Sequence, residues 1–367
     1  MKGLILAGGA GTRLRPITHT SAKQLVPLAN KPILFYVVEQ MATAGIKNIG
    51  MIVGDSADEI EAAVGDGSAL GVKVTYIRQV EPLGLAHCVL IAEDFLGTDD
   101  FVMYLGDNML EQDLKSFVDR FEAERSRQLQ LDDPHAISPV AQILLAHVDD
   151  PRQFGVVELD AMDRVIRLIE KPVDPPSDLA LVGVYIFDKT VHEAVRAIKP
   201  SSRGELEITD AIQWLLEQGH RLNQEILDGW WIDTGKKDPL LLCNALLLDR
   251  IEPRLDGLID DRSTVTGRVV IEPGVVLERS VVRGPAIIGA GTILTDTYVG
   301  PYTSICANCE LRDAEIEHSV VLEGSRILGV HRIHDSLLGK EVEVVRSGER
   351  PRGTRLMLGD HSRADLE

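Results

Sequence analysis

The chain has 367 residues, of which 44% are hydrophobic and 26% are charged. This composition is typical of a globular protein of about two domains, and it excludes wholesale disorder. Acidic residues outnumber basic residues by 57 to 38, and the formal net charge of −19 argues against a protein that coats nucleic acid through a basic face.

The sequence also argues against a membrane or secreted protein. It contains no apolar run long enough to span a membrane, and the apolar stretch after Lys2 is too short for the core of a signal peptide. Four cysteines in a chain of this length do not predict a disulfide framework. We therefore expect a cytoplasmic protein with neither a nucleic-acid nor a membrane partner.

Strand-like and helix-like segments alternate along the first two thirds of the chain. One helix is predicted between Pro32 and Gly45, and another from a cap at Ser56 through Val64. The polar segment Ser126–Pro139 is predicted to be a surface loop. The alternation predicts an α/β fold with helices on both faces of a sheet. The predicted strands are Gly3–Ala7, Ile49–Val53, Val72–Tyr76, Phe101–Tyr104, Ile143–Val148 and the hairpin of Val156–Leu159 with Val165–Ile169.

The last third of the sequence has a different period. Apolar residues recur there mostly at steps of five or six residues. A hexapeptide period is the signature of a parallel β-helix, in which each face of a triangular coil points one apolar residue inward. An irregular β-sandwich is the alternative. The repeating positions are Val265, Ile271, Leu277, Ile288, Leu294, Val299, Ile305, Leu311, Ile316 and Leu322.

These patterns predict the domain organisation. We expect an α/β domain over residues 1–240, a helical linker over 241–262 and a β-helix over 263–345, with the helix-like segment Leu240–Leu258 joining the two domains. Residues 346–367 are charged and predicted to fray. Because a β-helix more often serves assembly than chemistry, we expect a homo-oligomer.

A glycine-rich loop, Gly8-Gly9-Ala10-Gly11-Thr12-Arg13-Leu14, follows the first predicted strand. Glycines let backbone N–H groups approach an anion, and Arg13 adds a guanidinium group. The loop lacks the Gly-Lys-Ser/Thr ending of a Walker loop, and Leu14 stands where the dinucleotide fingerprint has its third glycine. A tight turn without a ligand is the simpler alternative.

Local charge favours a ligand at this loop. The first 38 residues contain five basic residues and no acidic residue, in a chain of net charge −19. This pattern predicts a polyanionic ligand such as a nucleoside triphosphate. The basic residues are Lys2, Arg13, Arg15, Lys23 and Lys31.

The glycine-rich loop together with Ser21-Ala22-Lys23-Gln24 resembles the sugar-1-phosphate nucleotidyltransferases. Within them the chain is most similar to the glucose-1-phosphate thymidylyltransferases of the long form. The resemblance covers essentially the whole chain. It implies a Rossmann-like nucleotidyltransferase domain with a mixed central sheet, followed by a left-handed β-helix. The implied reaction joins glucose 1-phosphate to dTTP, releases pyrophosphate and supplies dTDP-glucose for deoxysugar biosynthesis.

The resemblance also implies which residues bind the substrates. Arg13 and Lys23 are the implied catalytic contacts to the triphosphate, and Lys23 is expected to be exposed. The implied nucleotide-binding residues are Leu6, Gly8, Gly9, Gly11, Thr12, Arg13, Gln79, Gly84 and Leu85. The implied sugar-phosphate residues are Phe154, Gly155, Glu170, Lys171 and Val182.

Two carboxylates are candidate Mg²⁺ ligands. Asp107 follows an apolar run, and the carboxyl end of a core strand is where α/β sheets bind ligands. Asp233 lies in Trp231-Ile232-Asp233-Thr234-Gly235. Mg²⁺ is commonly held by one or two carboxylates with phosphate oxygens and water. The resemblance assigns both residues to the metal; a turn-capping role is the alternative for each.

Gln79 is the candidate for reading the base. A side-chain amide both donates and accepts, which suits the imide edge that thymine and uracil share. His87 departs from the glutamine that short-form relatives often carry, and an ordinary helix residue is the simpler interpretation. The segment Arg203–Asp210 resembles a family segment near the sugar pocket, with an acidic helix start as its alternative.

Weaker signals leave other functions open. Cys306, Cys309, His331 and His334 are a candidate zinc site. The alternative is that the two cysteines are ordinary buried residues at repeat positions. The alternative enzymes are a uridylyltransferase and a bifunctional nucleotidyltransferase and acyltransferase, for which His318 is the only histidine between Val265 and Leu322. The alternative of another class is an inactive regulatory subunit of the same fold.

Overall fold

A computed structural model describes residues 1–9, 11–130, 138–346 and 359–365 of the chain. The chain divides into two compact units. Unit 1 consists of Met1–Ala10 and Leu34–Trp231, and unit 2 of Gly11–Ile33 and Ile232–Glu367. The glycine-rich loop is therefore shared between the units, and its Ala10 lies outside the described residues. The domain boundaries expected from the sequence stay predictions.

Unit 1 is built on a nine-stranded mixed sheet with the order β10-β9-β11-β6-β1-β4-β5, in which β8 pairs with β11 and β12 pairs with β8. Strand β1 is parallel to β4 and β6, whereas β11 is antiparallel to β6 and β8. The mixed α/β fold is thus confirmed. The strands are β1 (Lys2–Leu6), β4 (Asn48–Val53), β5 (Lys73–Arg78), β6 (Phe101–Leu105), β8 (Ala141–His147), β9 (Gly155–Leu159), β10 (Val165–Glu170), β11 (Leu179–Phe187) and β12 (Leu222–Ile226), with the short β7 (Asn108–Leu110) after β6.

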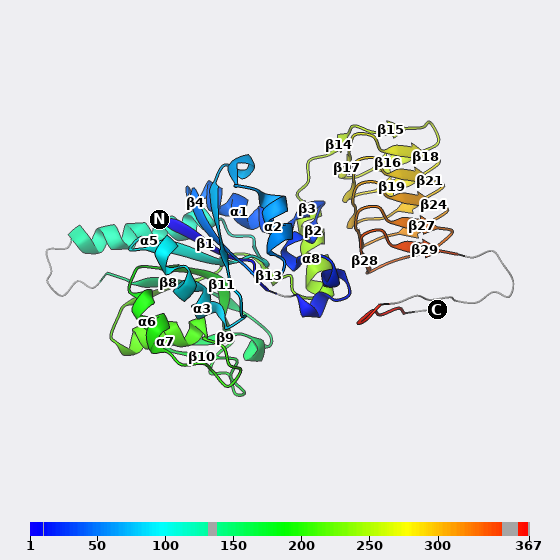
Figure 1. Cartoon of the computed structure of the whole chain (residues 1–367). Helices are drawn as coiled ribbons and strands as arrows, with labels where there is room; N and C mark the ends of the chain where they lie inside the picture. The colour runs from blue at the N-terminus through cyan, green and yellow to red at the C-terminus, as the bar shows by residue number, and fades with distance from the viewer. Residues whose placement is uncertain (10, 131–137, 347–358, 366–367) are drawn as a thin grey trace. The chain divides into compact units, whose positions relative to one another are not determined.

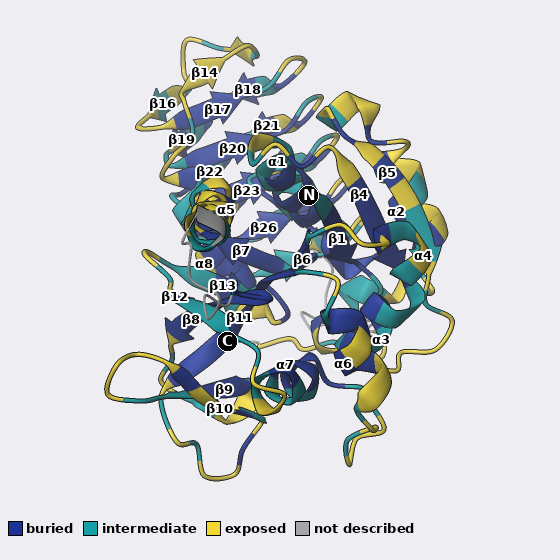
Figure 2. Cartoon of the chain, turned by 90° about the vertical axis from the view of Figure 1, so that its left-hand side faces the viewer, coloured by how far each residue is buried: buried dark blue, intermediate teal, exposed yellow. Residues whose placement is uncertain are grey.

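The sequence pattern missed β11, although every residue of this strand is buried. A central strand that is covered on both faces reads as a continuous apolar run without the alternation of a half-exposed strand. Figure 2 shows β1, β6 and β11 as the buried centre of the sheet.

The two helices predicted after Pro32 and Ser56 begin and end near the predicted residues. The segment from Ser126 was predicted to be a loop, but α5 continues to Gln130, because arginine, glutamine and leucine are good helix formers. Residues 131–137 of that predicted loop lie outside the described residues. The helices are α1 (Ile33–Thr43), α2 (Ala57–Val64), α3 (Leu85–Ile91), α4 (Glu93–Leu96), α5 (Leu114–Gln130), α6 (Val191–Ala197) and α7 (Ile208–Glu217).

Unit 2 contains three stacks of short parallel strands (Figure 1). Val269 pairs with Ala286 and Ala286 with Thr303, so these turns of the coil take 17 residues each. The arrangement is consistent with the expected left-handed β-helix. Its strands are β14 (Arg254–Leu255), β17 (Val269–Ile271), β20 (Ala286–Ile288), β23 (Thr303–Ile305), β26 (Val320–Val321) and β28 (Leu337–Leu338); β15 (Leu258–Ile259), β18 (Val276–Glu278), β21 (Ile293–Thr295), β24 (Glu310–Arg312), β27 (Arg326–Leu328) and β29 (Glu343–Val345); and β16 (Thr264–Thr266), β19 (Val281–Arg283), β22 (Tyr298–Val299) and β25 (Glu315–Ile316).

The predicted apolar column forms the core of this β-helix. All its members from Ile271 to Leu322 are at most 2% exposed, and Val265 packs against them from a partly buried position. The column also includes Val282, which fills the one long step in the predicted repeat. Cys306 and Cys309 are buried, as expected for repeat positions.

The helix predicted at Leu240–Leu258 is shorter in the structure. Helix α8 (Lys237–Leu248) ends ten residues earlier than predicted, because Pro253 and the first β-helix strand β14 follow within a few residues. Most of the predicted polar tail lies outside the described residues.

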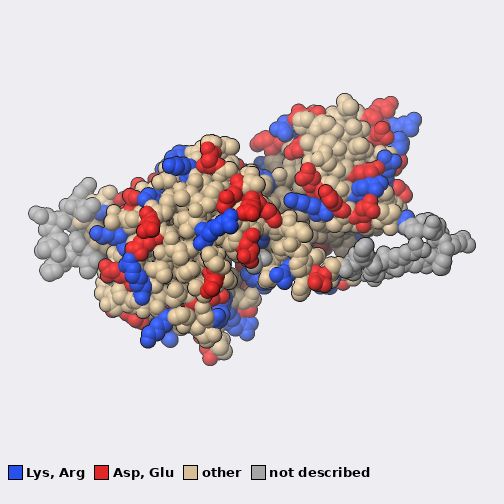
Figure 3. Space-filling model, in the orientation of Figure 1, with Lys and Arg blue, Asp and Glu red and all other residues tan. Residues whose placement is uncertain are grey.

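No helix in the described part of the chain is both long and apolar enough to cross a membrane. Acidic and basic side chains are intermixed on the face shown in Figure 3. The expected homo-oligomer and cytoplasmic location stay predictions.

Candidate functional site

In unit 1, several predicted site residues follow the carboxyl ends of adjacent parallel strands. The Gln79 N–H donates to the Val53 carbonyl at 2.8 Å, and the Gly106 N–H donates to the Leu6 carbonyl at 2.9 Å. These bonds bring the residues after β1, β5 and β6 to one edge of the sheet. Leu6 itself is only 7% exposed, so its backbone is the part that a ligand at this edge would meet.

Gly8 lies at this edge where another segment approaches closely. A Cβ atom added at Gly54 would lie 2.8 Å from the Gly8 carbonyl oxygen. A side chain does not fit between the two segments without displacing one of them. The start of the glycine-rich loop is therefore held against the end of β4. Gly9 follows as an exposed residue.

The Gln79 side chain is held by groups of its own neighbourhood. Its Nε2 atom lies 3.3 Å from the Gly84 carbonyl oxygen and 3.0 Å from His87 Nδ1. Gly84 has a φ of 101°, and a Cβ atom there would lie 2.4 Å from the Leu206 carbonyl oxygen. The predicted base residues Gln79, Gly84 and Leu85 thus form one local group, to which His87 belongs.

The sugar-side residues gather around the Glu170 carboxylate. The Thr209 hydroxyl donates to Glu170 Oε2 at 2.7 Å, and Arg203 Nη2 donates to Glu170 Oε1 at 3.2 Å. Lys171 Nζ lies 3.4 Å from the same Oε1 atom. The carboxylate is therefore oriented by one hydroxyl and two cations. Arg203 and Thr209 lie in or beside the segment that sequence analysis could not separate from an acidic helix start.

The other predicted sugar residues are placed by the strands β9 and β11. A Cβ atom at Gly155 would lie 2.7 Å from Thr209 Oγ1, so glycine is needed beside the Glu170 group. Val182 is fully buried in β11. Lys171 has a φ of 42° and donates its N–H to the Phe154 carbonyl at 3.0 Å. A lysine with a left-handed backbone conformation is uncommon, and such backbone strain is often found at functional positions.

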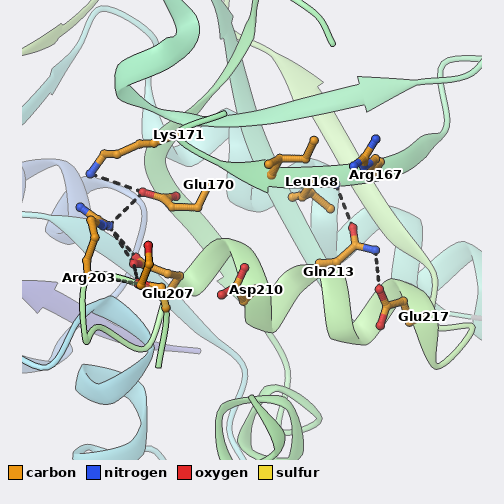
Figure 4. Close-up of a pocket in the computed structure, with 12 residues that line it drawn as sticks. Arg167, Leu168, Glu170, Lys171, Arg203, Glu207, Asp210, Gln213 and Glu217 are labelled. Carbon is orange, nitrogen blue, oxygen red and sulfur yellow. Dashed lines mark hydrogen bonds and ion pairs between the residues drawn. The ribbon is translucent and has the colours of Figure 1, made fainter. Parts of the chain in front are cut away.

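A cavity of about 480 Å³ opens at this group (Figure 4). One end is formed by Glu170, Lys171 and Arg203, and the opposite end by Gln213 and Glu217. The first end holds two cations, Lys171 and Arg203, beside the carboxylates of Glu170 and Glu207. The cavity includes neither Phe154 nor Val182 among its lining residues.

Acidic residues of this cavity shift the pKa values of their neighbours. Burial by itself lowers the pKa of Arg203, but the hydrogen bonds from Arg203 to Glu207 at 2.8 and 2.9 Å outweigh this and raise it. Burial, together with the charges of Glu207 and Glu170, raises the pKa of the Asp210 carboxyl. Arg203 therefore remains a cation beside Glu170.

Asp107 lies directly after β6, as predicted, and belongs to a short polar chain. Asn108 donates to Asp107 Oδ1 at 3.0 Å and accepts from Trp231 Nε1 at 2.6 Å. The Trp231 ring meets the Phe154 ring edge-on, with centroids 5.1 Å apart. Asn108 and Trp231 thus connect the predicted metal ligand to the predicted sugar residues. Sequence analysis did not assign a role to either.

In unit 2, Arg13 and Lys23 lie around the Asp233 carboxylate. Arg13 Nη2 is 3.8 Å from Asp233 Oδ2, and Lys23 Nζ is 3.8 Å from Asp233 Oδ1. The Gly235 N–H donates to Asp233 Oδ1 at 2.9 Å, and a Cβ atom at Gly235 would lie 3.0 Å from Lys23 Nζ. This brings together the predicted triphosphate contacts and one predicted metal ligand.

The expectation that Lys23 is exposed is wrong, because Lys23 is only 6% exposed. Gly11 adopts a φ of 61°, and a Cβ atom there would lie 2.9 Å from Lys23 Cβ. The loop therefore folds tightly over the lysine stem. Thr12 and Arg13, in contrast, are exposed.

The loop that carries Lys23 continues into a hairpin of β2 (Pro27–Leu28) and β3 (Lys31–Pro32), which is attached to the β-helix. The Ala29 N–H donates to Asn244 Oδ1 at 2.9 Å, and Asn30 Nδ2 donates to the Ile305 carbonyl at 2.8 Å. Asn244, which is fully buried in α8, also accepts from the Ser304 hydroxyl at 2.8 Å. The β-helix and α8 thus support the hairpin that follows Lys23, a connection that sequence analysis missed.

The donor chemistry of Asp107 and Asp233 fits a hard divalent cation. Both are partly exposed carboxylates that supply oxygen ligands, as Mg²⁺ requires. The described residues hold no group of three or more histidine, cysteine or acidic side chains placed to bind a metal ion. A Mg²⁺ ion held by either carboxylate would therefore take most of its ligands from phosphate and water.

The weaker candidates of the β-helix are placed differently. Burial raises the pKa of the Cys306 thiol to about 12, which keeps the thiol protonated and opposes metal binding. The His318 ring is hydrogen-bonded to the Asp335 carboxylate and packs edge-on against the Tyr302 ring. His331 lies near Asp313 and Glu315.

Comparison with known proteins shows the relationships of the chain. The nucleotidyl transferase family matches residues 2–250, which is more than half of the chain. The whole chain is 54% identical to a glucose-1-phosphate thymidylyltransferase of Streptomyces griseus, of which it covers 99%, and 52% identical to one of Streptomyces antibioticus, of which it covers 100%.

The fold of the chain is also similar to that of a solved structure. It is a Bacillus anthracis protein assigned as a glucose-1-phosphate thymidylyltransferase, in complex with sucrose. The TM-score is 0.61 at 36% identity, and the match covers 69% of this chain and 98% of that chain.

Proposed function

The chain belongs to the nucleotidyl transferase family, and we propose that it transfers the thymidylyl group of dTTP to glucose 1-phosphate, giving dTDP-glucose and pyrophosphate. The observation that carries this proposal is the similarity, over the full length, to two Streptomyces glucose-1-phosphate thymidylyltransferases. The groups that surround Lys23 and Glu170 support it, because each offers cations where a phosphate is expected.

In the proposed reaction, a phosphate oxygen of glucose 1-phosphate attacks the α-phosphorus of dTTP. The bond between the α-phosphorus and the oxygen that bridges to the β-phosphate breaks, and pyrophosphate leaves with both electrons of that bond. Two anions must meet, so the protein acts mainly by positioning them and neutralising their charge.

The residues have distinct roles in this proposal. Arg13 and Lys23 neutralise the triphosphate, with the backbone of Gly8, Gly9, Gly11 and Thr12 around it. Glu170 accepts hydrogen bonds from sugar hydroxyls, and Lys171 binds the sugar phosphate. The buried position of Lys23 strengthens its effect, since charge interactions are stronger away from water.

Asp107 and Asp233 are the residues that would hold Mg²⁺ in this proposal. The bound cation would supply charge neutralisation between the two phosphate groups. Asn108 orients the Asp107 carboxylate through its 3.0 Å hydrogen bond, and the Gly235 N–H orients the Asp233 carboxylate.

A nucleotide panel tests the proposal. The protein is incubated with Mg²⁺, glucose 1-phosphate and dTTP, UTP, dCTP or ATP, and pyrophosphate release is measured. We expect dTTP to be the best substrate and dCTP to be about 5- to 150-fold poorer, since a mismatched buried hydrogen bond costs about 1–3 kcal/mol. The thymine methyl is worth only about 0.8 kcal/mol, so UTP should react measurably.

The panel also separates the alternatives. A clear preference for UTP makes the protein a uridylyltransferase, and a preference for ATP removes the pyrimidine assignment. If none of the four nucleotides gives pyrophosphate, the result supports an inactive regulatory subunit instead. Retention of Arg13, Lys23, Asp107, Lys171 and Asp233 in the chain argues against that outcome.

A further inference from the structure

Two polar neighbours of the Gln79 carboxamide determine its orientation, and the Cys88 thiol also lies within hydrogen-bond reach of it. Its Nε2 atom lies 3.3 Å from the Gly84 carbonyl oxygen and 3.0 Å from His87 Nδ1. A carbonyl oxygen only accepts hydrogen bonds, so the amide atom that faces Gly84 has to be the nitrogen. The second amide hydrogen is then directed to His87. His87 Nδ1 therefore accepts, which requires a neutral ring with its proton on Nε2.

This arrangement leaves the amide oxygen as the atom available to a ligand. Both hydrogens of the amide are used within the protein, and Oε1 points toward the start of the glycine-rich loop. A Cβ atom added at Gly8 would lie 3.6 Å from Gln79 Oε1. The oxygen thus faces the backbone that follows β1, where the proposed nucleotide-binding residues begin.

We propose that His87 is a positioning residue that selects the base by holding Gln79 with its oxygen toward the nucleotide. A base edge that meets this oxygen must donate a hydrogen bond. The N3 position of thymine or uracil carries a hydrogen and donates, whereas N3 of cytosine accepts. This inference rests on the proposed function, and it replaces the expectation that the amide both donates to and accepts from the base.

His87 is needed because an amide has nearly the same shape when its oxygen and nitrogen exchange places. In the exchanged orientation the amide would offer N–H to the ligand and would suit cytosine. The Gly84 carbonyl opposes the exchange through one contact, and the His87 acceptor adds a second. Removal of the second acceptor should therefore relax the choice of base and leave the phosphate and sugar contacts in place.

Steady-state kinetics with dTTP and dCTP test this role. For the His87→Leu variant we expect the ratio of kcat/KM for dTTP to that for dCTP to fall about fivefold, which is the effect of about 1 kcal/mol in selectivity. His87→Gln can again place an acceptor near Gln79 and should keep the ratio within about twofold of the wild type. The control is His147→Leu, the same change at an exposed histidine of β8, which should leave the ratio unaltered.

A double-mutant cycle shows whether His87 acts through Gln79. In a Gln79→Ala background, His87→Leu should have no further effect on the ratio. An equal effect in both backgrounds would overturn the proposal, as would an unchanged ratio in His87→Leu with a wild-type thermal midpoint. These outcomes are distinct from failure of the proposed function, because in that case the wild-type protein itself would show no preference for dTTP.

Discussion

Unit 1 and unit 2 support their proposed site residues in different ways. In unit 1, Gln79 and Asp107 follow paired parallel strands, and Glu170 ends β10. In unit 2, Arg13 and Lys23 lie on short 3-10 turns, and a hairpin further along the same loop is attached to α8 and the β-helix. The residues proposed for the base and the sugar thus depend on sheet pairing, whereas those proposed for the triphosphate depend on a few polar contacts over long sequence separations.

This difference suggests what the β-helix contributes. The sequence analysis predicted that the β-helix would serve assembly rather than chemistry. In the structure, residues Ile305 and Ser304 of β23 support the hairpin that follows Lys23, directly or through Asn244. The β-helix therefore also stabilises part of the proposed catalytic machinery, whatever its role in assembly.

The largest effect is expected from the loss of the buried cation. Lys23→Met should lower kcat by about 100- to 1,000-fold, the usual loss when one stabilising group is removed from an anionic transition state. Stability should change little, since methionine fills the same buried volume and Asp233 keeps Arg13 as a partner. Turnover and the thermal midpoint are measured together. A collapsed midpoint with normal activity per folded molecule would make Lys23 structural.

The next largest effect is expected from the loss of either predicted metal ligand, Asp107 in unit 1 or Asp233 in unit 2. Asp107→Asn and Asp233→Asn should each lower turnover by about 100-fold, equivalent to about 2.7 kcal/mol of barrier. Both losses should be partly relieved by more Mg²⁺ if the ion is held more weakly. Activity is measured across a Mg²⁺ titration, with Asp249→Asn, at the residue that follows α8, as a control. Near-normal turnover in both variants would refute the metal assignment.

A smaller and more selective effect is expected on the sugar side. Glu170→Gln keeps the shape of the side chain but removes the charge that holds Arg203 and Lys171. Hydrogen bonds to charged groups contribute about 1.5–3 kcal/mol, so kcat/KM for glucose 1-phosphate should fall about 10- to 100-fold. The KM for dTTP should stay near its wild-type value. An equal rise in both KM values would show that Glu170 does not act on the sugar alone.

The smallest effect tests the support of the loop by the β-helix. Asn244→Ala leaves the Ala29 N–H and the Ser304 hydroxyl without their acceptor, which costs about 1–3 kcal/mol of stability. We expect kcat/KM for dTTP to fall about fivefold, because the loop is held less firmly.

The matched control for this prediction is Ser319→Ala. Ser319 is also fully buried, but its hydrogen bonds stay within the β-helix. This variant should lose stability and keep its kinetics with dTTP. If both variants lose stability equally and neither changes the kinetics, the β-helix does not support the loop.

Much of the sheet and the β-helix follows from sequence patterns, because these patterns are local. The apolar column from Ile271 to Leu322 was predicted from its period, and Asp107 from its place after an apolar run. Strand β11 was missed because a strand buried on both faces lacks alternation.

The supports of the site were harder to predict, because they join residues far apart in the chain. Asn30 and Ile305 are 275 positions apart, and Asn244 and Ala29 are 215 apart. One signal was present: Asn244 is the only polar side chain between Leu240 and Leu248, and a buried polar group in an apolar helix requires partners. The orientation of Gln79 depends on the exact position of His87, which no sequence pattern specifies.

The fate of the labelled phosphates of dTTP tests the central claim most directly. The wild-type protein is incubated with Mg²⁺, glucose 1-phosphate and dTTP that carries ³²P at either the α- or the γ-phosphate, and the products are separated by ion exchange. The proposed attack at the α-phosphorus predicts that the α label enters dTDP-glucose and that the γ label appears only in pyrophosphate. Transfer of the γ label to the sugar, or its release as inorganic phosphate, would contradict thymidylyl transfer and the roles proposed for both units.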